Sequence, residues 1–136
     1  MFKGTAHFQP DEFDCKSTPG SGVHMSPAFV DKLENLRAAV ADSLGWEVPF
    51  EINSGYRTPE YNAAVSDTGM HGPHTTGRAV DIHIFGQEAF LIASLAKSCG
   101  FTGIGVSQKG PIGSRFIHLD DLTKEDGFPR PRLWSY

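Results

Sequence analysis

One long amphipathic segment constrains the fold of this chain more than any other feature. Apolar residues recur there at steps of four, three, four and four, the spacing of one helix face, at Phe29, Leu33, Leu36, Val40 and Leu44. Ser26 is suited to cap the helix start, and Pro27 fits the first helical position, where an N–H has no partner. Gly45 can end the helix in a left-handed conformation. The segment therefore predicts one helix with one apolar face between Ser26 and Gly45.

Shorter elements make up the middle of the chain. The residue pattern predicts a short helix near 59–66, a loop at 67–77 and a second long helix at 87–99. Four strands are expected, at residues 48–53, 79–84, 103–108 and 115–119. Helices that bracket clusters of short strands predict an α+β fold with a small, mostly antiparallel sheet flanked by helices.

The two ends of the chain are expected to pack onto this body. Residues 1–25 are irregular in pattern, with Phe8, Phe13 and Met25 as anchors, and the tail at 121–136 is expected to pack back through Leu133, Trp134 and Tyr136. The chain has 136 residues, 39% of them hydrophobic, which is enough for one core and not for two. We therefore expect a single domain over residues 1–136.

Composition and charge exclude several classes of protein. The net charge of −4 argues against a nucleic-acid binder, which usually presents a basic face. No segment approaches the roughly twenty apolar residues of a membrane span, and the N-terminus lacks the apolar region of a signal peptide. Synthesis in the cytosol is expected, with release by another factor if the protein acts outside the cell. Cys15 and Cys99 are too few for a disulfide framework and are expected to be reduced, Cys99 buried on a helix and Cys15 in a loop. Without a repeat or coiled coil, we expect a monomer.

A histidine and an aspartate in the middle of the chain could share a metal. His74 lies in the predicted loop, Asp81 follows seven residues later on a predicted strand, and Gly77 between them permits a sharp turn. His118, from another strand, would complete three ligands with one position open, the usual arrangement of catalytic zinc. The spacing alone also fits a solvated His74 and an Asp81 that caps a turn.

Several motifs, in order, resemble the zinc D,D-peptidases, the M15 peptidases. The central motif Ser-x-His-x-x-Gly-x-Ala-x-Asp is matched by GPHTTGRAVD at 72–81, in which Gly72 replaces the serine. SGYRTPEYN at 54–62 resembles the preceding block, and GIGV at 103–106 with FIHLD at 116–120 resembles the block of the third ligand. FDCK at 13–16 and RLW at 132–134 are weaker similarities. The resemblance extends over nearly the whole chain and implies a D,D-peptidase-like fold.

The resemblance implies a role for each matching residue. His74, Asp81 and His118 would be the zinc ligands. Arg57 would bind a substrate carboxylate or a developing oxyanion, for which a guanidinium is suited, and Ser54 and Tyr56 beside it are expected to bind substrate. For Arg57 the alternative is a structural ion pair with Glu60 or Asp67.

The general base is the open position in this assignment. Relatives carry Asp, Glu or His two or three residues before the third ligand, where this chain has Phe116 and Arg115. Asp120, two residues after His118 and on the same strand face, could accept the proton from a water or hold His118 or Arg57 in place. His71 could assist proton transfer or be an exposed loop residue. His83 shares a strand face with Asp81 and is the rival ligand to His118.

The activity implied by the resemblance is zinc-dependent hydrolysis of an amide bond in the stem peptide of peptidoglycan. Endopeptidases and D,D-carboxypeptidases share the metal motif. A phage or prophage wall hydrolase, released by a holin or carried in the virion, is expected, with a cytosolic dipeptidase as the enzymatic alternative. A non-catalytic zinc module that binds cell wall or is structural is the alternative of another class.

Overall fold

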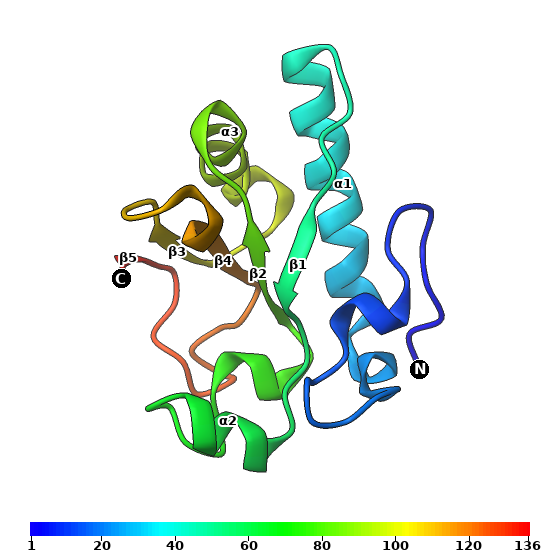
Figure 1. Cartoon of the computed structure of the whole chain (residues 1–136), viewed down its shortest axis with the longest axis vertical. Coiled ribbons are helices and arrows are strands. Elements are labelled where there is room, and N and C mark those ends of the chain that lie inside the picture. Colours follow the sequence, from blue (N-terminus) through cyan, green and yellow to red (C-terminus); the bar gives the residue numbers. More distant parts are fainter.

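A mixed sheet of five strands organises the molecule, in the order β1-β2-β4-β3-β5 (Figure 1). The computed structural model describes all residues from 1 to 136. The strands are β1 (Glu51–Ser54), β2 (Ala79–His83), β3 (Gly103–Ser107), β4 (Phe116–Asp120) and β5 (Arg132–Ser135). Every pairing is antiparallel except that of β3 with β5, which is parallel. The expected α+β fold with a mostly antiparallel sheet is confirmed.

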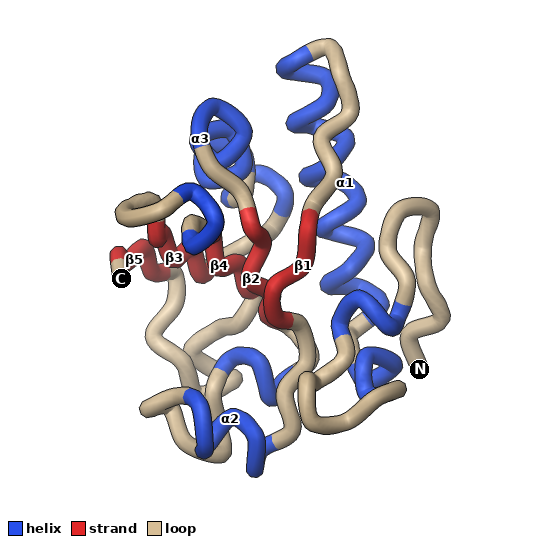
Figure 2. The backbone as a smooth tube through the Cα atoms, in the orientation of Figure 1, coloured by secondary structure: helices blue, strands red, loops and turns tan.

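Three α-helices and five short 3₁₀ turns accompany the sheet (Figure 2). The helices are α1 (Pro27–Leu44), α2 (Pro59–Val65) and α3 (Gly86–Leu95). The 3₁₀ turns are η1 (Pro10–Phe13), η2 (Ser21–His24), η3 (Pro73–Thr76), η4 (Lys97–Cys99) and η5 (Ile112–Ser114). None of the helices is both long and apolar enough to pass through a membrane.

The longest helix begins and ends where the sequence predicts. The Ser26 hydroxyl accepts a hydrogen bond from the N–H of Phe29 at 3.2 Å, and Gly45 follows the last turn with φ 87°. Phe29, Leu33, Leu36 and Val40 are fully buried. They form one core with the inward side chains of β2 and β4 and with α3. The opposite face of the sheet, which we call the ligand face, carries Asp81, His118 and Asp120.

The C-terminal segment differs from its prediction. Residues 121–131 run from the end of β4 toward α2 and return to the sheet, where β5 pairs with the outer edge of β3 (Figure 1). Trp134 is half-buried on this strand, but Leu133 is 72% exposed, so the prediction that Leu133 packs on the body is wrong. A four-residue strand after two prolines has no clear periodicity, and its pairing partner lies about thirty residues earlier in the chain.

Two smaller expectations also need correction. The second long helix ends at Leu95, and η4 continues it only as a 3₁₀ turn before Gly100, which has φ 97°. The two cysteines are free, but it is Cys15 that is buried, while Cys99 is half-buried. The Cys15 thiol accepts a hydrogen bond from the N–H of Thr58, so this N-terminal segment packs against the start of α2.

Candidate metal centre

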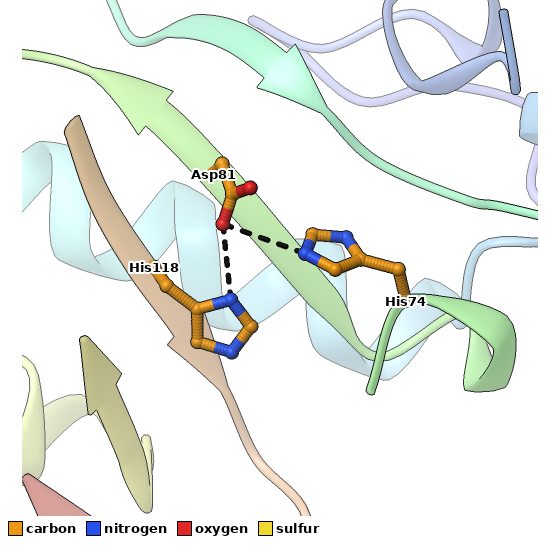
Figure 3. Close-up of side chains that lie close together, drawn as sticks. All are labelled: His74, Asp81 and His118. Carbon is orange, nitrogen blue, oxygen red and sulfur yellow. Dashed lines mark hydrogen bonds and ion pairs between the residues drawn. The ribbon is translucent and has the colours of Figure 1, made fainter. Parts of the chain in front are cut away.

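Three potential metal ligands from three elements converge at the ligand face. His74 comes from η3, Asp81 from β2 and His118 from β4, and one ligand atom from each lies within 4.8 Å of the other two (Figure 3). Asp81 and His118 are directly opposite each other in the β2–β4 register. The Asp81 Oδ1 atom lies 3.0 Å from His118 Nδ1 and 3.4 Å from His74 Nε2. The sequence-predicted group is therefore brought together by the fold.

The ring of His74 is oriented by the main chain of the preceding motif. Its Nδ1 lies 2.9 Å from the carbonyl oxygen of Gly55, a contact that requires the proton on Nδ1. The lone pair of Nε2 then faces Asp81. The N–H of Arg57 also donates to the carbonyl of His74, at 3.1 Å. A side chain at Gly55 would collide with Phe13, since an added Cβ would lie 2.7 Å from the Phe13 Cα.

His118 is held from the other side by Asp120. The Nε2 atom of His118 lies 2.8 Å from Oδ2 of Asp120, which leaves Nδ1 as the atom that faces Asp81. A carboxylate on the far nitrogen fixes the tautomer of a metal-binding histidine and raises its basicity. The indole of Trp134 packs over the ring, with centroids 5.1 Å apart. Gly105, opposite His118 on β3, leaves the space that this indole occupies.

Asp120 is fully engaged in holding other groups. Its side chain is completely buried, and Arg130 donates to both of its oxygens, at 2.9 and 2.7 Å. Burial alone would raise the pKa of Asp120, but the hydrogen bonds from Arg130 and His118 outweigh burial and lower this pKa to about 2. Asp120 is therefore an ionised carboxylate without a free lone pair toward the cavity. These contacts favour the holding role over the role of general base.

The electrostatics of the ligands suit a cation. Burial would raise the pKa of Asp81, yet the neighbouring His74 and His118 lower it, so its carboxylate is ionised. Burial would likewise lower the pKa of His118, but its hydrogen bonds to Asp120 and Asp81 raise it. Two imidazole nitrogens and one carboxylate oxygen are a usual ligand set for catalytic zinc. The residues present therefore fit the metal, and both histidines already have the outer hydrogen bonds that such ligands carry.

Arg57 lies beside this group and has donors to spare. Its Nε donates to the hydroxyl of Ser54 and its Nη1 to Oδ1 of Asn62, both at 3.1 Å. Neither Glu60 nor Asp67 forms an ion pair with it, so the alternative of a structural salt bridge is wrong. A guanidinium has five N–H donors, and the two neutral partners leave most of its charge available to a ligand.

Asn62 is a residue of the site whose role the sequence did not reveal. It is 1% exposed, and its amide nitrogen donates to the Thr68 hydroxyl at 2.8 Å and to the Gly69 carbonyl at 2.5 Å. It thus connects Arg57 to the turn after α2. The sequence did place Asn62 at the end of the motif at 54–62. Its burial and its three hydrogen-bond partners, however, can be seen only in the folded structure.

The ligands open into a cavity of about 640 Å³. Its wall includes side chains from the motif regions and from the C-terminal tail: Arg57, Asp67, His74, Asp81, Phe116, His118, Phe128, Arg130, Arg132, Trp134 and Tyr136. A smaller cavity of about 200 Å³ adjoins it, and Arg57 and Val65 line both. Ser54 and Tyr56 line this smaller cavity. Their contact with substrate remains a prediction.

Two other histidines considered from the sequence lie away from the ligands. His71 is exposed and is not among the residues that line the large cavity, so a catalytic role for it remains a prediction. His83 faces the Glu51 carboxylate at 3.0 Å and the Ile112 carbonyl at 3.2 Å. It is outside the group that could hold a metal, whose third member is His118.

Comparison with known protein families agrees with this geometry. The family model described as Peptidase M15 matches residues 6–120. The chain belongs to the peptidase M15 family. No curated protein and no solved structure matches it. Membership together with the His-Asp-His group identifies an M15 metallopeptidase, and the family implies hydrolysis of peptidoglycan peptides. All three candidate ligands of this M15 domain lie within the matched residues, whereas β5 follows them.

Proposed function

We propose that this M15 peptidase is a zinc enzyme that cleaves an amide bond in the stem peptide of bacterial peptidoglycan. The observation that carries the proposal is the convergence of His74, Asp81 and His118 beside Arg57 on the wall of one cavity. An endopeptidase or D,D-carboxypeptidase of phage or prophage origin is the form that we favour. A protein of this kind would reach the wall through a holin or as part of the virion, and would act as a monomer.

The chain's own residues supply binding, orientation and charge. Zinc, when bound, supplies a Lewis acid that polarises a carbonyl and lowers the pKa of a water. Arg57 would hold a substrate carboxylate or the oxyanion with its free donors. Asp120, supported by Arg130, would keep His118 in the tautomer that presents Nδ1. Trp134 and the residues around it would exclude water from one side of the ligands.

The proton acceptor has three candidates: Asp120, Asp67 and His71. Asp120 is near His118, but both of its oxygens are bonded. Asp67 is the other acidic residue, besides Asp81, on the wall of the large cavity, and it forms no ion pair. Asp67→Asn with normal zinc content and a large loss of turnover would assign the base to Asp67. Normal turnover in this variant would leave the role to Asp120 or to His71.

A metal and activity measurement on one sample tests the proposal. We expect about one zinc per chain by elemental mass spectrometry, and release of amino groups from purified peptidoglycan that is lost with a chelator and restored by zinc. Absence of zinc after incubation with excess metal would refute the metal site.

The second candidate function is a non-catalytic zinc module that binds cell wall. The sequestration of Asp120 by Arg130 is the observation that favours it. Such a module would contain zinc and sediment with peptidoglycan, yet release no amino groups from walls of several chemotypes. That combination of results would replace the peptidase proposal.

A further inference from the structure

Some of the basic side chains around the two cavities form ion pairs with carboxylates of the chain, and others do not. The protein as a whole is acidic, with a net charge of −4. Among the basic residues that line the cavities, Arg130 is neutralised by Asp120. Arg57, Arg132 and Lys16 form no ion pair with any carboxylate of the chain. Unpaired cations that surround a cavity raise the local concentration of anions and favour an anionic ligand.

Their places in the sheet put them on both sides of the metal ligands. Arg132 is on β5, at one edge of the sheet, and Arg57 lies three residues after the end of β1, the strand at the other edge. Asp81 and His118 lie on β2 and β4 between them. Since neighbouring strands are about 4.8 Å apart, a peptide that crosses the ligand face can extend past the metal in both directions. The small cavity continues this path beyond Arg57.

The small cavity is built to receive a polar group beyond Arg57. Ser54, Tyr56 and Tyr61 line it together with Lys16 and Asp14. The Asp14 carboxylate already accepts hydrogen bonds from the N–H groups of Gly20 and Gly22, at 2.9 and 2.7 Å. Those bonds partly offset its charge, whereas Lys16 is exposed and has no partner. The lining of this cavity therefore carries two positive charges, on Lys16 and Arg57, against the one negative charge of Asp14.

From this arrangement we propose that Lys16 determines specificity by binding a carboxylate of the substrate. This carboxylate lies farther from the metal ligands than the group that Arg57 binds, whether that group is another carboxylate or the oxyanion. The inference rests on the proposed function, because the ligand is the stem peptide. Two carboxylates of such peptides fit this chemistry, the α-carboxylate of γ-linked glutamate and the side-chain carboxylate of diaminopimelate. Bacteria that amidate the selected carboxylate would present a poorer substrate.

Synthetic stem peptides provide the test. The zinc-loaded protein is assayed on the unamidated peptide, on the peptide amidated at glutamate and on the peptide amidated at diaminopimelate. We expect one amidation to raise KM roughly ten- to a hundredfold, the effect of one lost charged hydrogen bond. Lys16→Gln should raise KM on the unamidated peptide by the same factor and leave kcat unchanged. The KM values of the unamidated peptide and of the amidated peptide that the wild type disfavours should then be equal. Lys16→Arg should retain the preference, and Lys3→Gln, which changes an exposed lysine outside both cavities, should behave as the wild type.

The outcomes separate this inference from the peptidase proposal. Cleavage of all three peptides with the same KM, or equal effects of Lys16→Gln on acid and amide peptides, would overturn the role of Lys16 and leave the peptidase intact. If no peptide is cleaved, the same series is titrated by nuclear magnetic resonance. Tighter binding of the unamidated peptide that depends on Lys16 would then support the inference while the peptidase proposal fails. Binding without that dependence, or no binding, would overturn it.

Discussion

Each histidine of the candidate metal site has one ring nitrogen turned toward Asp81, because the other nitrogen forms a hydrogen bond on the far side of the ring. The main chain at Gly55 does this for His74, and the Asp120 carboxylate does it for His118. Only the second partner can be removed by mutation, since Asp120 accepts through its side chain and Gly55 through its main-chain carbonyl. Arg130 in turn keeps Asp120 ionised and in place.

Asp120→Asn tests whether this carboxylate positions His118 or accepts a proton. The neutral amide is a weaker acceptor for Nε2, so zinc affinity should fall about 10- to 100-fold. We expect most of the turnover to return when excess zinc saturates the site. A competition titration with a chromophoric chelator measures the affinity, and amine release measures the turnover.

The control for this variant is His118→Ala, which should lose zinc and activity together. Retained zinc in His118→Ala would reject His118 as a ligand. Turnover of Asp120→Asn that stays low when zinc is saturating would instead show that Asp120 takes part in proton transfer.

At the residue scale, the sequence predicted which residues form the group that could hold a metal, but not their supports. His74, Asp81, His118 and Arg57 could be named because several motifs, in order, resemble those of the M15 family. The departure at Gly72 could not be explained from the sequence. In the structure, a Cβ at Gly72 would lie 2.2 Å from the Thr68 hydroxyl oxygen, so Thr68 occupies the space of the missing serine side chain. The sequence does not indicate that Thr68 and Gly72 are in contact, because the turn between them brings them together only in the folded chain.

At the scale of elements, β3 supports the site because two of its residues are glycines, which have no side chains. Gly103 and Gly105 face Asp120 and His118 in the register of β3 with β4. A Cβ at Gly103 would collide with the Asp120 carboxylate, and one at Gly105 would lie 2.6 Å from the indole nitrogen of Trp134. The two glycines therefore make room for a carboxylate and for an aromatic ring.

Gly105→Ala should move Trp134 away from His118. We expect a loss of about 1–3 kcal/mol of unfolding free energy, which is typical of overpacking, and a shift in tryptophan fluorescence. Urea denaturation and emission spectra measure the two effects. Gly113→Ala is the matched control, because an added Cβ there meets no atom within 4 Å. An unchanged stability and spectrum for Gly105→Ala would contradict the packing described for this strand.

Glu34 connects α1 to the N-terminal segment. It accepts hydrogen bonds from the Thr5 hydroxyl, the His7 N–H and the His7 ring, each at 2.7 Å. Burial alone would raise the pKa of Glu34, but these hydrogen bonds outweigh it and the pKa is lowered. A lowered pKa in the folded state means that the ionised form stabilises the protein above the ordinary glutamate pKa of about 4.3. This stabilisation is lost as the pH falls through the lowered pKa.

Glu34→Gln should therefore destabilise the protein by about 1 kcal/mol at pH 7. The difference from the wild type should shrink as the pH falls below the ordinary glutamate pKa of about 4.3 and through the lowered pKa of Glu34. Urea denaturation at several pH values measures both, with Glu47→Gln, at an exposed position without hydrogen-bond partners, as the control. A difference that is constant with pH would exclude the ionised carboxylate as its source.

Elements with strong periodicity were predictable, and the edge strand was not. The stripe from Phe29 to Leu44 and the caps at Ser26 and Gly45 are local signals, so α1 could be read from the sequence. β5 exists because β3 offers an unpaired edge, a condition set by tertiary structure rather than by its own four residues. The sequence predicted that Trp134 packs on the body of the protein. It did not predict that Trp134 covers His118, because this contact depends on the pairing of β5 with β3.

At the scale of the whole molecule, the ligands tie together segments that are distant in the chain. Bound zinc would connect η3, β2 and β4, and the unfolded chain cannot hold the three side chains together. A ligand that binds only the folded state stabilises it by about 2.7 kcal/mol at a concentration one hundred times Kd. For a domain of this size, we expect that to raise Tm by roughly 8 °C.

Calorimetry with and without a chelator measures this effect. The shift should grow with the logarithm of free zinc and should vanish in His118→Ala, which lacks a ligand but is tested under the same conditions. A shift of equal size in that variant would mean that zinc binds elsewhere on the protein.

The cavity has two walls of different origin along the chain. The residues that match the family supply every ligand and Arg57, while Phe128, Arg130, Arg132, Trp134 and Tyr136 come from the segment after the match. The candidate ligands with Arg57, on one side, and the five side chains of the C-terminal wall, on the other, are thus encoded in separable stretches of the gene. Exchange of residues 121–136 between relatives would replace one wall of the cavity while Lys16, Arg57 and the three candidate ligands stay in place, provided that an arginine still reaches Asp120.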